Sequence, residues 1–299
     1  MKHIMVILAI LLLAGSSLAC CVMPEIPDID INVPTIEVGE MQNQREEIPP
    51  VDAGSVEVEV VFAAGEMEVD VGDSEQLFSG HFRYNVERWE PTVAYNDGVL
   101  TIEQGGIEQE QDWGIPTGNT HNEWELEFSP ETPLDMDFKF GAGKGNLDFG
   151  GLQLTNLNMD MGAGDFDVRF DEPNEVEMDD LSLDTGAAKL NVSGIGHASP
   201  ERVSVNSGVG EIALDFTGQW GNSSDVDITA GVGAVTLRLP DNVGVRVEVD
   251  GGLTNVESGG LRERGDAYVN DAFGEAEIEL HIHITAGIGN LRLTEVSND

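Results

Sequence analysis

A repeated unit in the C-terminal half of the sequence constrains the fold most strongly, and residues 157–168 are a typical copy. In each copy a segment that alternates apolar and polar residues meets a Gly-x-Gly motif, and a second alternating segment follows. The first glycine recurs at spacings of 21 to 24 residues, and of 35 for the last interval, at Gly141, Gly162, Gly186, Gly208, Gly231, Gly252 and Gly287. A repeat of this length is typical of a solenoid or a related array.

The residues before each of these glycines keep one register across all the copies. The positions three and five residues before the glycine are always apolar, and the position between them is always polar. The apolar residues three positions before it are Phe138, Met159, Leu183, Val205, Ile228, Val249 and Ile284. Alternation with a period of two predicts strands that have one buried face.

Small residues recur in the motif itself. Glycine allows a sharp turn of the backbone and lets neighbouring segments approach closely. We therefore predict a structural corner in every coil, formed by Gly141, Gly143, Gly162, Gly164, Gly186, Gly208, Gly210, Gly231, Gly233, Gly252, Gly287 and Gly289.

Together these patterns predict an all-β fold, a β-helix-like parallel solenoid with one continuous path. Its coils are expected over residues 135–296, stacked in chain order with like strands paired about 4.8 Å apart. Residues 54–134 carry further strand patterns, among them Val56, Val58 and Val60 alternating with glutamates. We expect this region to form a β cap on the first coil, because the open end of a solenoid needs a cover.

Residues 1–19 have the organisation of a secretory signal, with Lys2 before an apolar run and small residues after it. Cys20 follows directly, as in bacterial lipoprotein signals, so we predict export to the cell envelope and a lipid anchor in the membrane at Cys20. Two alternatives stay open: modification of Cys21 instead, and ordinary secretion with two incidental cysteines. Residues 20–53, rich in proline and acidic residues, are expected to form an extended tether.

The charge of the chain argues against two classes of partner. A formal net charge of -42 and a pI near 4.1 make nucleic acid and anionic membrane surfaces poor partners. We interpret the acidity first as a solvated surface. No cofactor is expected.

The order of several motifs resembles known families. The N-terminal motifs are residues 80–85, Trp89, Pro91, Val93, Trp124, 133–135, 141–143 and 147–148, and they resemble the toast-rack N-terminal domain family. The following coils resemble the putative adhesin β-solenoids. Tyr268, Ile278, Ile282, Ile284, 287–289 and Leu291 are similar to the C-terminal domain of LiaF-type cell-wall-active antibiotic response proteins. The resemblance covers about residues 54–296 and brings no catalytic residues with it.

Two kinds of candidate site emerge from the pattern. If coils stack in chain order, Asp160 lies beside Asp184 and Asp227 lies beside Glu248. Carboxylates about 5 Å apart are candidates for weak binding of a divalent cation, although tolerated repulsion is the alternative. The same stacking predicts a ladder of alternating charge through Asp180, Arg202, Asp225 and Arg246, in which the scarce basic residues interrupt acidic rows.

Other motifs are weaker. Residues 141–145 resemble a nucleotide-binding loop, but no helix follows to present amides to a phosphate. His281 and His283 lie two residues apart, and two histidines alone make a weak metal site. We find no catalytic constellation.

The sequence therefore favours a non-enzymatic, lipid-anchored binding or scaffold module, adhesin-like or linked to the cell-envelope stress response. Its partner would be an envelope protein or a glycan, and self-association through an open end of the solenoid is a further expectation. A carbohydrate-active β-helix enzyme is the first alternative, because fold alone does not exclude catalysis. A cation-binding surface protein is the second.

Overall fold

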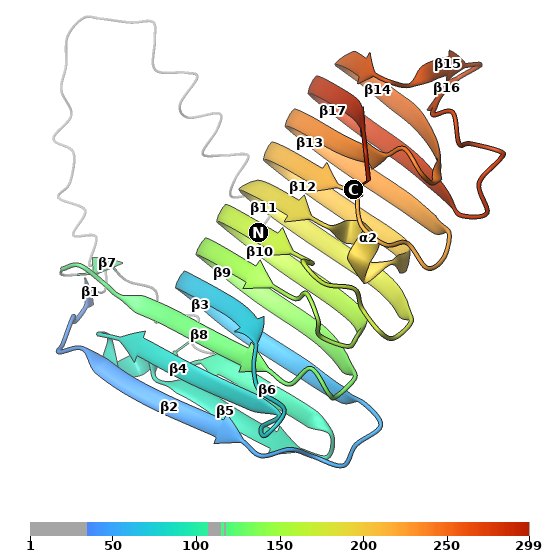
Figure 1. Ribbon diagram of the computed structural model, residues 1–299. Coiled ribbons are helices and arrows are strands. Elements are labelled where there is room, and N and C mark those ends of the chain that lie inside the picture. The colour runs from blue at the N-terminus through green and yellow to red at the C-terminus, as the bar shows by residue number, and fades with distance from the viewer. Residues whose placement is uncertain (1–34, 107–114, 117, 299) are drawn as a thin grey trace, which may run out of the picture. The chain divides into compact units, whose positions relative to one another are not determined.

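The computed structural model describes residues 35–106, 115–116 and 118–298. They form an all-β unit dominated by one 15-stranded sheet, most of whose long strands are parallel (Figure 1). The long strands are β3 (Val56–Val71), β9 (Leu134–Asp148), β10 (Leu154–Arg169), β11 (Met178–Ser193), β12 (Pro200–Asp215), β13 (Ser224–Pro240), β14 (Gly244–Gly259) and β17 (Glu279–Val296). The predicted signal and Cys20 lie outside the described residues.

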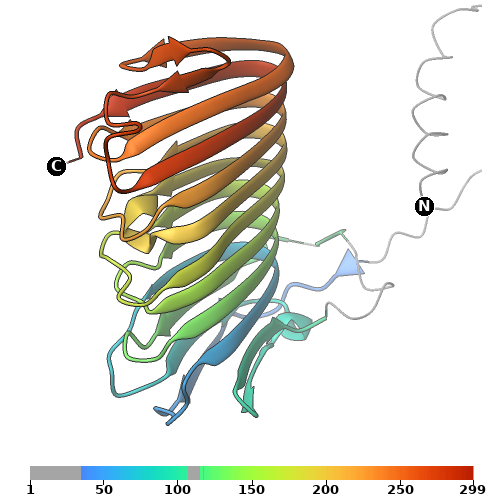
Figure 2. The ribbon, with the colours of Figure 1, turned by 90° about the vertical axis from the view of Figure 1, so that its right-hand side faces the viewer.

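Each long strand runs through its Gly-x-Gly motif without a break, where the sequence suggests two strands around a corner. In β10 the buried side chains nearest the motif are Leu157, Met159 and Met161 before it, but Phe166 and Val168 after it. The alternation thus shifts by one residue at the motif, so that both halves of the strand turn apolar side chains to the same side. Figure 2 shows the stacked strands curving over at one edge, with the connecting loops at the opposite edge.

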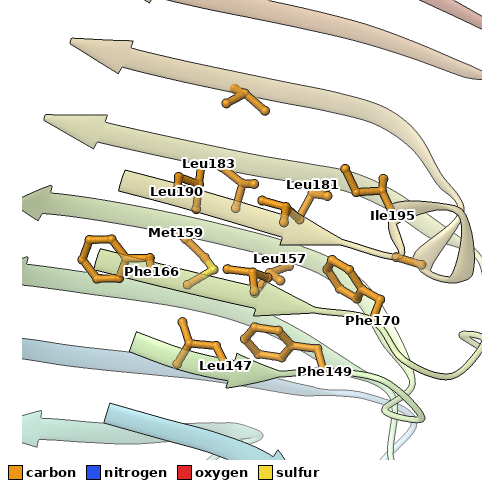
Figure 3. Close-up of a cluster of buried hydrophobic side chains, with 14 of the residues drawn as sticks. Leu147, Phe149, Leu157, Met159, Phe166, Phe170, Leu181, Leu183, Leu190 and Ile195 are labelled. Atoms are coloured by element: carbon orange, nitrogen blue, oxygen red, sulfur yellow. The ribbon is translucent and has the colours of Figure 1, made fainter. Parts of the chain in front are cut away.

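The hydrophobic core lies between the two halves of the curved sheet. Figure 3 shows side chains from consecutive strands gathered there, among them Leu157 and Phe166 of β10 and Leu181 and Leu190 of β11. All four are at most 1% exposed. Aromatic rings continue this packing near the motif, since Phe140 and Phe166 make an edge-to-face contact at 4.9 Å between ring centroids.

The second glycine of the motif is required by its conformation and by its neighbour. Gly164 has φ of 153°, which L-residues rarely adopt, and a Cβ there would lie 1.9 Å from the carbonyl oxygen of Gly143. Ala188 holds the equivalent place in β11, directly beside Gly164. It is not among the non-glycine residues with positive φ.

At the C-terminal end the long strands do not stack in the order in which they occur in the chain, so the predicted order is wrong there. β17 pairs with β13 along one side and with β14 along the other, so the last long strand is inserted between the two before it. A physical reason lies in the inner faces. β17 buries Leu280, Ile282, Ile284, Leu291 and Leu293 to 2% exposure or less, whereas β14 has an exposed serine, Ser258, where β17 has Leu293. Placing the more apolar strand inside the stack buries more apolar surface.

The N-terminal region extends the sheet beyond β3 in two branches. The first half of β3 pairs with β6 (Val99–Gln104), which pairs with β5 (Pro91–Asn96). The second half pairs with β8 (Asn122–Phe128), followed by β4 (Phe78–Tyr84) and β2 (Gln42–Ile48). β3 itself pairs with β9 in register from Val56 onward, so within 54–134 it belongs with the long coils.

Side chains bridge the place where the two branches separate. The side-chain oxygen of Gln104 accepts a hydrogen bond from the amide of Ala63 at 3.0 Å, and the Asn122 side-chain amide donates to the carbonyl of Ala64 at 2.9 Å. Gln104 and Asn122 are themselves buried and bonded to each other at 2.9 Å. They satisfy backbone groups of β3 between the segments that pair with β6 and β8, as buried polar groups require.

The expected tether, 20–53, differs from the structure in its C-terminal part. β2, residues 42–48, forms seven register pairs with β4 at the edge of the sheet. The strand is polar on both faces, so it lacks the apolar alternation that identifies a strand in sequence. The remaining elements are short: the pair β1 (Thr35–Ile36) and β7 (Ile115–Pro116), β15 (Arg262–Arg264), β16 (Ala267–Val269), the 3-10 turn η1 (Glu87–Trp89) and the helix α2 (Ile195–Ala198).

Candidate functional site

A groove of about 540 Å³ runs across β3 and β9 to β13 on the first glycines of the motif. Along it lie the residues two positions before each of these glycines, Lys139, Asp160, Asp184, Asn206 and Thr229, and Val61, which stands two positions before Ala63 in β3. The glycines leave this stretch of backbone without side chains, which is why a groove exists there.

The predicted neighbours Asp160 and Asp184 are register partners in this groove. Lys139 is the register partner of Asp160 on its other side. The hydroxyl of Thr185, which also lines the groove, is buried and has no hydrogen-bond partner within the described part of the chain. The adjacency of the two carboxylates is thus confirmed, whereas cation binding stays a prediction.

An exposed line of apolar side chains crosses the strands at the middle residue of the motif. Val209, Val232 and Ile288 lie on β12, β13 and β17 as consecutive register partners. They are 54%, 49% and 56% exposed, and we call them the apolar row. Ala187 and Ala163 continue the same line on β11 and β10 with smaller side chains. Such a contiguous exposed apolar line can contact another molecule.

The other predicted carboxylate pair is separated by a histidine. Because β17 lies between β13 and β14, His283 is the register partner of both Asp227 and Glu248, so the expected contact between these two acids is wrong. Glu248 pairs instead with Arg246, and Nε2 of His283 lies 3.7 Å from an oxygen of Asp250.

The predicted charge ladder changes for the same reason. His281 stands between Asp225 and Arg246, which the sequence places side by side. A second cavity, of about 530 Å³, opens over this cluster of acidic, basic and histidine side chains. Within the residues that the structure describes, no group of three or more histidine, cysteine or acidic side chains is arranged to hold a metal ion.

Basic residues do interrupt acidic rows on other strands, as predicted. Arg202 donates two hydrogen bonds to the carboxylate of Asp180, at 2.6 and 2.7 Å. This hydrogen bonding lowers the pKa of Asp180 below its ordinary value. Arg238 pairs with Asp215 of the preceding strand at 2.8 Å. In these two places the outward charges of neighbouring strands are matched in pairs, a structural use of the scarce cations.

Burial and neighbouring acids raise the pKa of two other carboxyl groups. Burial, with a contribution from Asp148, raises the pKa of Asp70. Burial likewise raises the pKa of Glu295, with contributions from Asp271 and Asp241. Neither group lies in the groove or beside the apolar row, so these shifts are features of the scaffold.

Sequence reasoning missed the apolar row and the position of β17. The signal for the row was present, because the middle residue of the motif grows from alanine in early copies to Val209, Val232 and Ile288 in later ones. The sequence of β17 itself does not indicate its position between β13 and β14.

No helix in the described ranges is both long and apolar enough to cross a membrane.

The stacked, curved sheet with glycines at its bend defines a repetitive β protein. The groove and the apolar row both lie at this bend, on the Gly-x-Gly motifs. The family model described as the N-terminal domain of toast_rack matches residues 37–193 and 173–238, more than half of the chain. The chain belongs to this toast-rack family, as its motifs suggest. No curated protein is detectably similar in sequence.

Several solved structures are similar to this chain at low identity. A putative cell adhesion protein from Clostridium sporogenes is 21% identical, with a TM-score of 0.48, over 86% of this chain and 100% of that one. A putative adhesin from Bacteroides fragilis is 11% identical, with a TM-score of 0.37, over 87% and 100%. A putative lipid binding protein from Parabacteroides distasonis is 12% identical, with a TM-score of 0.39, over 86% and 99%.

Proposed function

We propose that this chain is an exported binding or scaffold module of the cell envelope that works without catalysing a reaction. The apolar row carries the proposal. Its three side chains are about half exposed and lie in one line on adjacent strands, fixed by backbone pairing on both sides. Keeping apolar side chains in water costs free energy that contact with a partner would recover.

The partner we propose is an envelope glycan or protein. Attachment of an adhesin-like kind fits a long, regular surface, and a link to envelope stress rests on the resemblance to LiaF-type proteins. Binding should be tested with the full chain and purified envelope fractions, namely membrane vesicles and cell-wall glycan, by co-sedimentation.

The test compares two variants. Val209→Ser, Val232→Ser and Ile288→Ser combined should weaken co-sedimentation about tenfold or more. Met41→Ser with Val71→Ser removes exposed apolar side chains outside the row and should bind as the wild type does. Circular dichroism should show all three proteins folded. Equal binding by the wild type and the triple variant would contradict the proposal, and release of sugar products from the glycan would contradict the non-catalytic part.

The anchor is a separate part of the proposal. We propose that Cys20 carries lipid, because it follows directly on a signal-like segment. Metabolic labelling with palmitate should mark the wild type and not Cys20→Ala. The double variant with Cys21→Ala identifies the acceptor: label that survives Cys20→Ala but not the double variant would assign Cys21. Label that remains in the double variant would show that neither cysteine carries the lipid.

Cation binding is the second candidate function, and the pair of Asp160 and Asp184 favours it. Their strands hold them as neighbours in the groove at the first glycines of the motif. A cation that binds only the folded state raises the melting temperature with its concentration. Calcium should therefore raise the melting temperature more than sodium does at matched ionic strength.

The matched variants locate this effect. Asp160→Asn with Asp184→Asn should abolish the calcium excess, and Asp227→Asn with Glu248→Gln should leave it, because His283 separates that pair. A calcium excess that is absent from the wild type, or that survives the first double variant, would reject the groove as a cation site.

A further inference from the structure

β14 is an end strand that is only partly covered. On one side it pairs with β17 along its whole length, from Gly244 to Gly259. On the other side β16 pairs only with residues 246–248. From 249 to 259, within the described part of the chain, no strand lies against this side, and Figure 1 shows β14 next to the short β15–β16 hairpin at this end of the stack. An uncovered strand presents unpaired N–H and C=O groups that can pair with another strand.

The hydrophobic core is also incomplete at this edge. Val249 and Val256 are partly exposed, whereas their register partners on β17, Ile284 and Leu291, are 0% and 1% exposed. A cavity of about 310 Å³ lies beside them and is also lined by Tyr268. An added strand would bury both valines as every inner strand buries its own core residues.

The opposite end of the stack does not share this feature. There β6 and β8 cover the two halves of β3, and Leu100, Ile102 and Trp124 are at most 1% exposed. The long strand at that end is therefore covered, and the edges there belong to the shorter strands β2 and β5. The length of the open edge on β14 is limited, because Ser258 is exposed where β17 has Leu293, so the apolar part of the edge ends at Val256.

Charge indicates what would bind. Asp250 directly follows Val249 and Glu257 directly follows Val256, and the two acidic side chains are 79% and 59% exposed. β17 already places Arg292 3.1 Å from Glu257 and His283 3.7 Å from Asp250. Both carboxylates stay exposed all the same, so a basic side chain on an added strand would meet them as Arg202 meets Asp180 inside the stack. Two copies of this chain, each with a formal net charge of -42, repel each other. Charge therefore favours a basic partner over a second copy.

We propose that residues 249–257 of β14 accept an extended strand of another protein, with apolar side chains on Val249 and Val256 and basic side chains on Asp250 and Glu257. Backbone pairing would give affinity and the side-chain pattern would give selectivity, as in other cases of strand addition. Cross-strand pairs of opposite charge are stabilising and like pairs are destabilising. This surface is additional to the apolar row, and its test does not depend on that row.

The probe is a synthetic peptide with the sequence of residues 134–148, carrying Gly145→Val and Asn146→Lys. In parallel register it places Phe138 against Val249, Lys139 against Asp250, and its two changed residues against Val256 and Glu257. A second peptide differs only in carrying glutamate in place of lysine at positions 139 and 146, the two that face Asp250 and Glu257, and both peptides keep Lys144. With the full chain, the lysine peptide should bind at least tenfold more tightly, and hydrogen exchange should slow in residues 249–257.

Charge reversal on the protein provides the decisive control. Asp250→Lys with Glu257→Lys should reverse the preference between the two peptides. Asp227→Lys with Glu211→Lys makes the same charge change on strands that are paired on both sides, and should leave the preference as in the wild type. Any of the following overturns the proposal: equal binding of the peptides, protection elsewhere in the chain, or a dimer in sedimentation with residues 249–257 protected.

Discussion

At the scale of single residues, the backbone of the next strand decides which glycines are irreplaceable. A Cβ on Gly162 would lie 2.1 Å from the carbonyl oxygen of Gly141, and real Cβ atoms essentially never come this close to another atom. At Gly252, the same position of the motif in the end strand, the nearest atom is the carbonyl oxygen of Gly287 at 3.6 Å. The sequence shows seven equivalent glycines, but whether a position can accept a larger residue depends on how closely the neighbouring strand approaches it.

Gly162→Ala should destabilise the protein by more than about 1 kcal/mol, because the neighbouring backbone must move to admit the methyl group. Gly252→Ala should be neutral or slightly stabilising, since alanine reduces the entropy of the unfolded chain where it fits. Thermal unfolding followed by circular dichroism measures both. Equal melting temperatures for the two variants would show that the close approach at Gly162 is wrong.

At the scale of strands, side-chain ladders were predictable only where strands stack in chain order. The sequence places Asp180 beside Arg202 and Asp160 beside Asp184, and both neighbour relations are confirmed. It fails for Asp227 and Glu248, because alternation within a strand identifies its buried face but carries no information about its partner. Only the apolar content of β17 compared with β14 indicates which strand is better buried.

The ladder pair of Asp180 and Arg202 makes stability depend on pH. The hydrogen bond from Arg202 lowers the pKa of Asp180 in the folded state, so the pair stabilises the protein above the unfolded pKa, and this stabilisation is lost as pH falls through the folded pKa. Asp180→Asn should lower the melting temperature at pH 7. The difference from the wild type should vanish near pH 2, and a difference that is constant with pH would contradict this account.

Glu295 provides the comparison of opposite sign. Burial raises its pKa, so its ionised form costs stability at pH values above the folded pKa, and this cost disappears below the unfolded pKa. Glu295→Gln should therefore raise the melting temperature at pH 7 and leave it unchanged near pH 3. Lower stability of this variant at pH 7 would mean that the carboxylate makes a favourable contact in the folded protein.

At the scale of the whole molecule, the repeat was enough to predict an all-β fold of stacked parallel strands with a core on one side. The candidate sites were less accessible to sequence reasoning. The open edge of β14 and the pairing of Val232 with Ile288 in the apolar row both depend on β17 lying between β13 and β14, a pairing of strands that are not consecutive in the chain. The edge strand β2 was missed because its residues up to Glu47 are all polar, so apolar and polar residues do not alternate along it.

The position of β17 is thus the central claim, and engineered disulfides test it directly. In a background with Cys20→Ala and Cys21→Ala, Asp227→Cys with His283→Cys should form an intramolecular disulfide, because the two residues are register partners on adjacent strands. Asp227→Cys with Glu248→Cys should not, since a strand lies between them and Cα atoms more than about 7 Å apart cannot be bridged without backbone movement. Mass spectrometry after mild oxidation would distinguish the two. A disulfide in the second variant and none in the first would mean that the strands stack in chain order, and would remove the basis of the proposed binding edge on β14.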